Sequence, residues 1–235
     1  MDALTDALAR DLRRRGGIVE TGVRALSVSR DPSGWRVRLA NGTDRRSEAL
    51  LAALPAPAAS GVLAGLDAAL SAPLGEIEMG SATVVIVGFG SQTARVPEAS
   101  GWLVPRREGG PVQAVTMLSR KHPGTAPEGH DLARVFLRPA FAHSAQNEAR
   151  AAAVHHLRER TGWTGEPVWT AVHRWTDARP RYTLGHPERL AALDAALVRH
   201  PGLAIAGASL RGVGLPDVIA RAHDEADALL SSLSR

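Results

Sequence analysis

The middle of the chain contains four strand-like runs that follow one another with only short breaks. Each run is rich in apolar and β-branched residues and is bounded by Gly, Pro or charged residues, a pattern typical of strands in one sheet. The runs are SATVVIVGF, GWLVP, VQAVTMLS and LARVFLRP, within residues 81–139. Helical patterns dominate both flanks. A strand-rich middle between helix-flanked ends predicts one domain built from both termini, with a second domain inserted between them.

The N-terminal flank alternates between helix and strand patterns. Leu4, Leu8 and Leu12 recur every four residues until Gly16 and Gly17 stop the run, which predicts a first helix. Two strand-like runs follow, joined by the turn sequence Asp-Pro-Ser-Gly. The remaining predictions here are a short buried strand in ALLAALP and one helix over PAPAASGVLAGLDAAL.

The C-terminal flank shows the same mixture. Helices are predicted over QNEARAAAVHHLRERTGW and PERLAALDAALVRH, and strands over EPVWTAVHRW and GLAIAGAS. A final helix is expected to bury one apolar face, formed by Val218, Ile219, Ala222, Ala226, Leu229 and Leu233. The fold class is therefore mixed α/β.

Charge and composition exclude several classes of protein. The net charge of +4 could favour nucleic acid, but all basic residues except Lys121 are arginines, and they are scattered along the chain. We therefore expect no nucleic-acid partner. The absence of cysteine excludes disulfides and thiolate metal sites. No apolar run reaches the ~20 residues of a transmembrane helix, and the N-terminus lacks a secretory pattern. A soluble, cytoplasmic protein is expected.

Two motifs resemble functional sites but lack part of the pattern that such sites require. VGFGSQT (87–93) follows an apolar strand, but Thr93 replaces the third glycine of a dinucleotide loop and no helical pattern follows, so a strand-ending turn is predicted. His155 and His156 are adjacent, and adjacent helix positions point about 100° apart, so no metal site is expected. No nucleophile motif is present, and no residue shows the pattern of a general base.

The strongest local signal lies near the C-terminus. A buried strand leads into a turn containing Gly207, Gly212 and Gly214, and Pro216 suits the first position of the helix that follows. Glycines let the backbone approach a ligand, and the free N–H groups of a helix start favour phosphate or a group that becomes anionic. A simple packing turn has the same pattern, so the residues alone leave both interpretations open.

Two long motifs carry a family resemblance. HRWTDARPRYTLGH (173–186) and GLAIAGASLRGVGLPDVI (202–219) resemble the C-terminal signature of protoporphyrinogen oxidases, within the flavin amine-oxidase superfamily. Weaker similarities occur in the same order along the chain: MDALTDALA, TGVRALSV, ALLAALP, ATVVIVGF, GWLVPRREGG and AVTMLSRKHPGTAPEGH. Family members are much longer and begin with a G-x-G-x-x-G turn, which this sequence does not contain. It resembles the C-terminal half only, as a fragment, a truncated product or half of a split protein would.

The resemblance implies a domain plan. The fold would be a partial FAD-binding domain of the two-domain flavin amine-oxidase type, with an inserted strand-rich substrate domain. Residues 1–55 and 173–235 would belong to the FAD-binding domain, and residues 56–172 to the substrate-binding domain.

The resemblance also implies FAD as cofactor and assigns residues to it. The backbone of Val23 would meet the adenine, and Trp175 would lie close to the flavin. Val213, Gly214 and Leu215 would bring backbone N–H groups to the flavin near N1 and its neighbouring carbonyl. The structural alternatives are an ordinary strand residue for Val23 and a core residue for Trp175.

Apolar residues of the middle segment would contact the substrate. By resemblance, Leu103, Met117 and Leu118 fall in segments that line a tetrapyrrole pocket, although strand residues of this kind are core by default. Arg138, Arg179 and Arg181 could pair with propionates, but surface positions are the preferred interpretation for them.

The implied activity is removal of six electrons from a porphyrinogen in haem synthesis. FAD would take hydride in steps, and oxygen or another acceptor would reoxidise it. Protoporphyrinogen IX and coproporphyrinogen III both stay open as substrates. The alternatives are a catalytically silent tetrapyrrole-binding or interaction module, or another superfamily member such as an amine oxidase. A homodimer or a missing N-terminal half would cover exposed apolar surface, and peripheral membrane association stays open.

Overall fold

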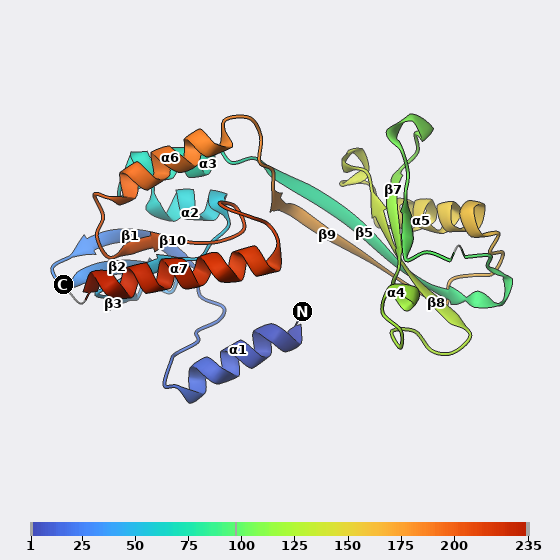
Figure 1. Cartoon of the computed structure of the whole chain (residues 1–235), viewed down its shortest axis with the longest axis horizontal. Coiled ribbons are helices and arrows are strands. Elements are labelled where there is room, and N and C mark those ends of the chain that lie inside the picture. Colours follow the sequence, from blue (N-terminus) through green and yellow to red (C-terminus); the bar gives the residue numbers. More distant parts are fainter. Residues whose placement is uncertain (1, 97, 234–235) are drawn as a thin grey trace. The chain divides into compact units, whose positions relative to one another are not determined.

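The computed structural model describes residues 2–96 and 98–233 and divides into two compact units (Figure 1). Unit 1 comprises the residues up to Ile77 and those from Tyr182 onward, and unit 2 is Glu78–Arg181. Both units combine helices with strands, which confirms the mixed α/β class. Unit 1 is therefore built from both ends of the chain.

A three-stranded antiparallel sheet forms one layer of unit 1. Its strands are β1 (Ala25–Asp31), β2 (Gly34–Leu39) and β3 (Asp44–Ser47), in the order β1-β2-β3. The predicted turn joins β1 to β2, and it needs Gly34 because φ is +127° there and a Cβ would approach Ser47 O at 2.5 Å. Trp35 and Leu39 are buried on β2 while Arg38 is exposed, as the alternation predicts.

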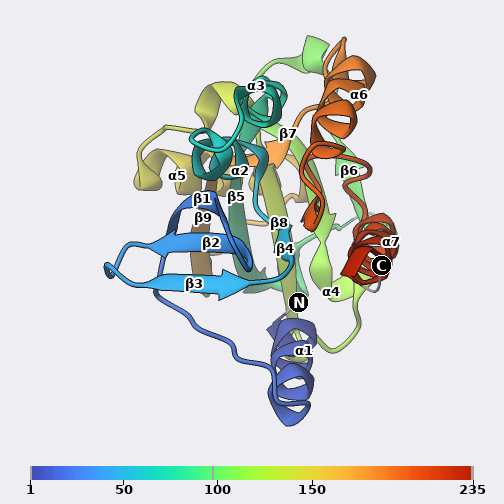
Figure 2. The ribbon, with the colours of Figure 1, turned by 90° about the vertical axis from the view of Figure 1, so that its left-hand side faces the viewer.

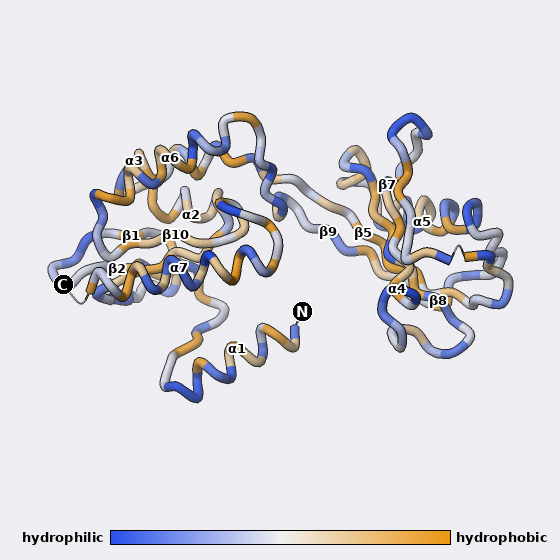
Figure 3. Tube along the Cα trace, in the orientation of Figure 1, coloured by the Kyte–Doolittle hydropathy of each residue, from blue (hydrophilic) through white to orange (hydrophobic). Residues whose placement is uncertain are grey.

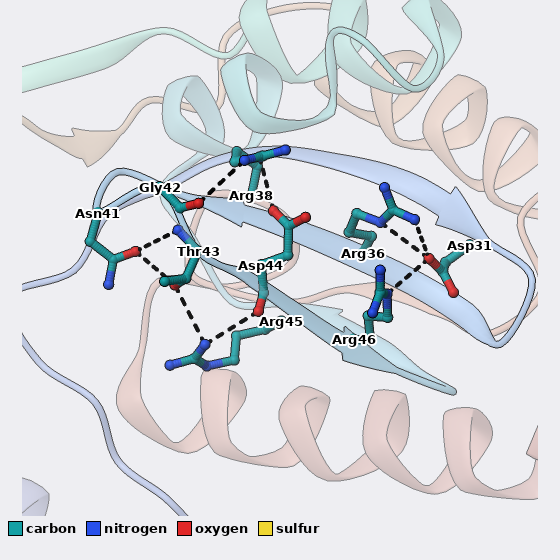
Figure 4. A network of polar contacts seen from close by, with 9 residues as sticks. All are labelled: Asp31, Arg36, Arg38, Asn41, Gly42, Thr43, Asp44, Arg45 and Arg46. Atoms are coloured by element: carbon teal, nitrogen blue, oxygen red, sulfur yellow. Dashed lines mark hydrogen bonds and ion pairs between the residues drawn. The ribbon is translucent and has the colours of Figure 1, made fainter.

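Ion pairs rather than apolar contacts hold the third strand. Asp31, at the end of β1, accepts hydrogen bonds from Arg36 of β2 (Nη2 at 2.6 Å) and Arg46 of β3 (Nε at 3.1 Å) (Figure 4). These bonds, with those from Ser33, hold the pKa of the Asp31 carboxyl well below its usual range, and the bond from Arg36 is the largest cause. The strand sequence Asp-Arg-Arg-Ser has no apolar residue, and β3 was not predicted.

Helices α2 (Ala56–Leu63), α3 (Ala68–Gly75) and α6 (His186–Leu197) form the helical part of unit 1. Helix α2 packs against β1 and α3, and α3 packs against α6 (Figure 2). A parallel pair, β4 (Leu50–Ala52) and β10 (Leu203–Ile205), joins segments from both ends of the chain. The prediction of one helix over residues 55–70 is wrong, because Asp67 starts a second helix by accepting a hydrogen bond from Ala69 N at 2.8 Å.

Helices α1 (Asp2–Arg14) and α7 (Leu215–Leu233) bury no residue fully. Both carry apolar residues along their length (Figure 3). The expected buried face of α7 is a wrong prediction: Ile219 and Leu233 are exposed, and the other members are only half-buried, namely Val218, Ala222, Ala226 and Leu229. The main contact of α7 is with the short strand β10 (Leu203–Ile205), and a helix buries its apolar face only where another element packs on it.

Unit 2 is a five-stranded antiparallel sheet with one helix packed on it. The strand order is β6-β7-β8-β5-β9. Helix α5 contacts β5, β7, β8 and β9, and it lies along one face of the sheet (Figure 1). The bounds are β5 (Met79–Gly90), β6 (Gly101–Leu103), β7 (Val112–Met117), β8 (His130–Leu137), β9 (Trp169–Pro180) and α5 (Gln146–Thr161). The short helices are η1 (Ser91–Thr93), η2 (Arg106–Glu108), α4 (Leu118–Lys121) and η3 (Pro139–Phe141).

Alternation along the strands divides the residues of unit 2 between two faces. Val85, Val87 and Phe89 of β5 point into the core beneath α5, where they meet Val135 and Leu157, all fully buried. The motif VGFGSQT ends β5 in a short 3₁₀ turn, which confirms that prediction. Within unit 2, no helix of the described residues packs on the opposite face of the sheet, and this face is available for a site.

The compact units divide the chain at other points than the predicted domains. Residues 56–77, which we placed with the substrate-binding domain, belong to unit 1, and residues 173–181 belong to unit 2. The roles of the domains stay a prediction. Within the described parts of the chain, no helix is both long and apolar enough to cross a membrane.

Candidate functional site

The open face of the unit 2 sheet is hollowed into a groove of about 910 Å³. Its floor is apolar, with Ala82, Val84 and Ile86 following one another on the same face of β5 because side chains alternate along a strand. Residues of the other strands complete it: Leu103, Gln113, Ala114, Thr116, Arg134, Phe136, His173, Trp175, Ala178 and Arg179. Size and lining are those of a small-molecule site.

A bulge in β9 shapes one side of this groove. Gly80 pairs with Arg179 and Ala82 pairs with Trp175, so Ser81 alone stands opposite three residues of β9. Asp177 adopts a left-handed φ of +46°, and the Ser81 hydroxyl both accepts from its N–H (3.0 Å) and donates to its carboxylate (3.1 Å). Trp175 and Arg179, four residues apart on β9, both line the groove.

Two of the predicted site residues meet in this groove. Leu103, predicted as a substrate contact, is 81% exposed, and Trp175, predicted near the flavin, is 48% exposed. The alternative of a core position for Trp175 is therefore wrong. His173 lies beside Trp175, with ring centroids 5.8 Å apart.

The other two predicted substrate contacts lie elsewhere. Met117 is fully buried in the core on the opposite face of the sheet, and Leu118 is half-buried at the start of α4. Neither lines the groove. The alternation in VQAVTMLS places Met117 on the same side as Val115, which is also buried.

The arginines considered for propionates differ in their surroundings. Arg138 donates to the carbonyl oxygens of Val104, Pro105, Gly109 and Gly110 and so fixes a loop. Arg181 pairs with Glu78 at 3.3 Å. Arg179 lines the groove, together with Arg134, which the sequence analysis missed. The signal was present, because Arg134 alternates with the buried residues Ala133 and Val135 on β8.

In unit 1, the glycine turn before α7 is held by two residues of the YTLGH motif. The Tyr182 hydroxyl donates to Ala208 O (2.7 Å) and accepts from Gly212 N (3.0 Å). Its ring stacks on buried His186 at 4.1 Å, and His186 Nε2 donates to Leu210 O at 2.8 Å. Burial raises the pKa of Tyr182, so its hydroxyl keeps the proton that the Ala208 bond needs.

The turn presents backbone donors without partners. Among the described residues, the N–H groups of Val213, Gly214 and Leu215 have no hydrogen-bond acceptor. Gly212 has φ +96°, and a Cβ there would lie 2.6 Å from Asp217 Cβ; at Gly214 it would lie 2.9 Å from Asp217 Oδ2. Asp217 adds negative charge beside the turn, so directed N–H groups rather than net charge would hold an anionic ligand here.

Val23, the residue predicted at the adenine, also belongs to unit 1. It lies in the segment between α1 and β1 and is 37% exposed. It is not part of a strand, so the alternative of an ordinary strand residue is wrong. The role of its backbone at the adenine stays a prediction. In residues 2–96 and 98–233, no cluster of three or more His, Asp or Glu side chains could hold a metal.

Comparison with known protein families identifies the group. The model of the flavin containing amine oxidoreductase family matches residues 1–230. The chain belongs to this family. The resemblance carried by the two C-terminal motifs is thus confirmed, and with it the flavin amine-oxidase type of fold.

Several curated relatives are named as porphyrinogen oxidases. Coproporphyrinogen III oxidase of Propionibacterium freudenreichii subsp. freudenreichii is 34% identical over 240 residues, which cover 99% of this chain and 43% of the relative. The enzyme of the same name from Bacillus subtilis is 30% identical, over 86% of this chain and 44% of the relative. Human protoporphyrinogen oxidase is 28% identical, over 99% and 50%. The chain spans about half the length of these relatives.

Solved structures agree with this placement. A protein of Exiguobacterium sp. 255-15, provisionally named protoporphyrinogen oxidase, matches with a TM-score of 0.85 at 26% identity, over 100% of this chain and 51% of that one. Cyclohexylamine oxidase of Brevibacterium oxydans matches with a TM-score of 0.69 at 20% identity, over 97% and 51%. The second likeness concerns the fold alone.

Proposed function

We propose that this chain forms part of an FAD-dependent enzyme that oxidises a porphyrinogen to the porphyrin in haem synthesis. The observation that carries the proposal is the groove of unit 2, whose open apolar floor suits the apolar body of a macrocycle. The names of the relatives support the same substrate class and favour coproporphyrinogen III over protoporphyrinogen IX. When bound, FAD would supply the acceptor for hydride, and oxygen or another acceptor would take the electrons onward.

The chain's own part in flavin binding would be the turn before α7. The N–H groups of Val213, Gly214 and Leu215 would face the flavin edge that becomes anionic on reduction. Tyr182 and His186 would keep these donors in place from behind. Val23 would contribute its backbone to the adenine side, and the resemblance further implies Trp175 as a neighbour of the flavin.

Groove residues would orient and shield the substrate. Leu103, Phe136 and Trp175 would contact its apolar faces and exclude water from them. His173 is exposed beside Trp175, but nothing in its contacts assigns it a proton-transfer role. We assign no general base to this chain.

A second candidate function rests on a specific absence in the sequence. No G-x-G-x-x-G motif occurs in the chain, so the FAD pyrophosphate would need a site from elsewhere. Without one, the chain would be a tetrapyrrole-binding module that does no redox chemistry.

Titration with FAD tests the proposal. The 235-residue chain is mixed with increasing FAD, and the flavin fluorescence and visible spectrum are recorded. Binding of FAD through the flavin-side donors is expected, and Gly212→Val should weaken it because a side chain is strained at φ +96° and would lie 2.6 Å from Asp217 Cβ. The matched control is Gly42→Val, which carries the same strain at φ +83° in unit 1, far along the chain and with open space around the Cβ position.

The outcomes separate the two functions. FAD binding that Gly212→Val weakens and Gly42→Val leaves unchanged supports the flavoenzyme. A folded chain that binds no FAD but binds coproporphyrin III favours the tetrapyrrole module. A folded chain that binds neither compound overturns both.

A further inference from the structure

We propose that Arg134 and Arg179 bind carboxylates at opposite ends of the substrate and so select a porphyrinogen that carries carboxylates on every ring. The proposal rests on the proposed function, because it takes the groove as the tetrapyrrole site. It assigns a specificity role to two residues that the catalytic chemistry does not use.

The two guanidinium groups belong to opposite ends of one apolar floor. Arg134 on β8 pairs with Ile86 of β5, whereas Arg179 on β9 pairs with Gly80 of the same strand. Six residues along a strand correspond to roughly 20 Å. Strand β5 runs between β8 and β9, so the two Cα atoms are also displaced by about 10 Å across the sheet. Both side chains line the same groove.

The surface between the two arginines is apolar. Ala82, Val84 and Ile86 lie between them on β5, flanked by Phe136 and Trp175. A ligand that touches both arginines must therefore carry an apolar body between its anionic groups. A nucleotide or a dicarboxylic acid would leave this floor exposed to water, whereas a tetrapyrrole would cover it.

Both arginines are available for a ligand. Among the described residues, neither guanidinium has an ion pair or a hydrogen bond, in contrast to Arg138 and Arg181. No aspartate or glutamate belongs to the described lining of the groove. Charge complementarity then favours an anionic ligand, and a planar guanidinium suits a carboxylate because it can donate two parallel hydrogen bonds.

The placement of the two charges distinguishes the two candidate porphyrinogens. Protoporphyrinogen IX carries two propionates on neighbouring rings, so its carboxylates lie at one edge and can reach only one end of the floor. Coproporphyrinogen III carries one propionate on each of four rings, so it can reach both ends at once. The groove therefore fits the four-carboxylate compound better.

Porphyrin titrations of the full chain test this assignment. Coproporphyrin III and protoporphyrin IX, the stable oxidised products, are titrated against wild type, Arg134→Gln, Arg179→Gln and the double variant, with porphyrin fluorescence as readout. Arg107→Gln is the matched control, since Arg107 is an exposed arginine of unit 2 that does not line the groove. Circular dichroism checks that every variant is folded.

Specific changes in affinity are expected. Each single variant should bind coproporphyrin III about fivefold more weakly, as for a solvent-exposed ion pair. The double variant should lose about 25-fold, because sites this far apart act additively. Protoporphyrin IX should lose affinity in only one of the single variants. The tetramethyl ester of coproporphyrin III should bind wild type weakly.

One result would overturn the role of the two arginines alone, and another would overturn the proposed function as well. If coproporphyrin III binds both single variants as tightly as the Arg107→Gln control, the arginines do not bind its carboxylates. The proposed function is not affected by that result. Equal affinity of the ester and the free acid would have the same meaning. If folded wild type binds no porphyrin at all, the groove is not a tetrapyrrole site and the proposed function fails with the inference.

Discussion

Replacing Tyr182 with phenylalanine isolates the hydroxyl that holds the glycine turn before α7. The ring can still stack on His186, so only the hydrogen bonds to Ala208 O and from Gly212 N are lost. A protein hydrogen bond contributes about 0.5–1.5 kcal/mol net. Because Tyr182 is 43% exposed, water can replace part of this, and we expect about 1.5 kcal/mol for the pair.

Hydrogen exchange measures this loss directly. Among the described residues, the Gly212 N–H has no acceptor other than the Tyr182 hydroxyl. A loss of about 1.4 kcal/mol corresponds to tenfold faster local opening, so peptides covering residues 207–214 should exchange roughly tenfold faster in Tyr182→Phe. Peptides of β5 in unit 2 provide the internal control. Unchanged exchange in the turn would refute the idea that Tyr182 positions it.

Further predictions concern the core, two titrating groups and association. Leu157→Ala, at a fully buried position on α5, should destabilise unit 2 by about 2–5 kcal/mol in urea unfolding; a smaller loss than 1 kcal/mol would contradict the packing. Burial lowers the pKa of His156, which accepts from Trp102 Nε1 at 3.1 Å and must be neutral to do so. The unfolded chain therefore takes up the proton first, and stability should fall as the pH drops through about 6.5. His156→Gln should flatten this dependence, and His155→Gln on the exposed side should leave it. The pKa of Asp31 is held low by Arg36, so its contribution is present above the unfolded carboxyl pKa of about 3.9 and is lost on acidification; Asp31→Asn should lower stability at neutral pH and weaken the acid dependence, which acid titration of unfolding checks. The exposed apolar residues of α1 and α7 predict self-association, and size-exclusion chromatography that gives a monomer at every concentration would contradict it.

Local patterns predicted most of the elements because the forces behind them act over a few residues. The turn sequence Asp-Pro-Ser-Gly predicted the hairpin of β1 and β2, and Gly34 supplies the backbone conformation that other residues rarely adopt. The run QNEARAAAVHHLRERTGW gave α5 nearly to its ends, where Gly162 takes a left-handed φ of +67° and stops the helix.

Elements held by polar contacts escaped prediction. Strand β3 has no apolar residue, and ion pairs from Arg46 to Asp31 and from Arg38 to Asp44 accompany its backbone pairing with β2. The start of α3 depends on a local contact, the hydrogen bond that Asp67 accepts from Ala69 N, and the prediction of one continuous helix overlooked this cap. The periodicity of apolar residues carries no information on such polar contacts, so it could not predict these elements.

The candidate site depends on both local and distant information. The glycine turn is readable from sequence because φ-permissive residues and a helix start stand in one short stretch. The groove is not, since β5 is apolar on both faces: Ala82, Val84 and Ile86 alternate with Val85 and Val87. Only α5 decides which face is core, and α5 lies more than fifty residues further on. An apolar face that unit 2 itself leaves uncovered would favour aggregation. Together with two arginines that have no partner among the described residues, this face suits a ligand that covers both.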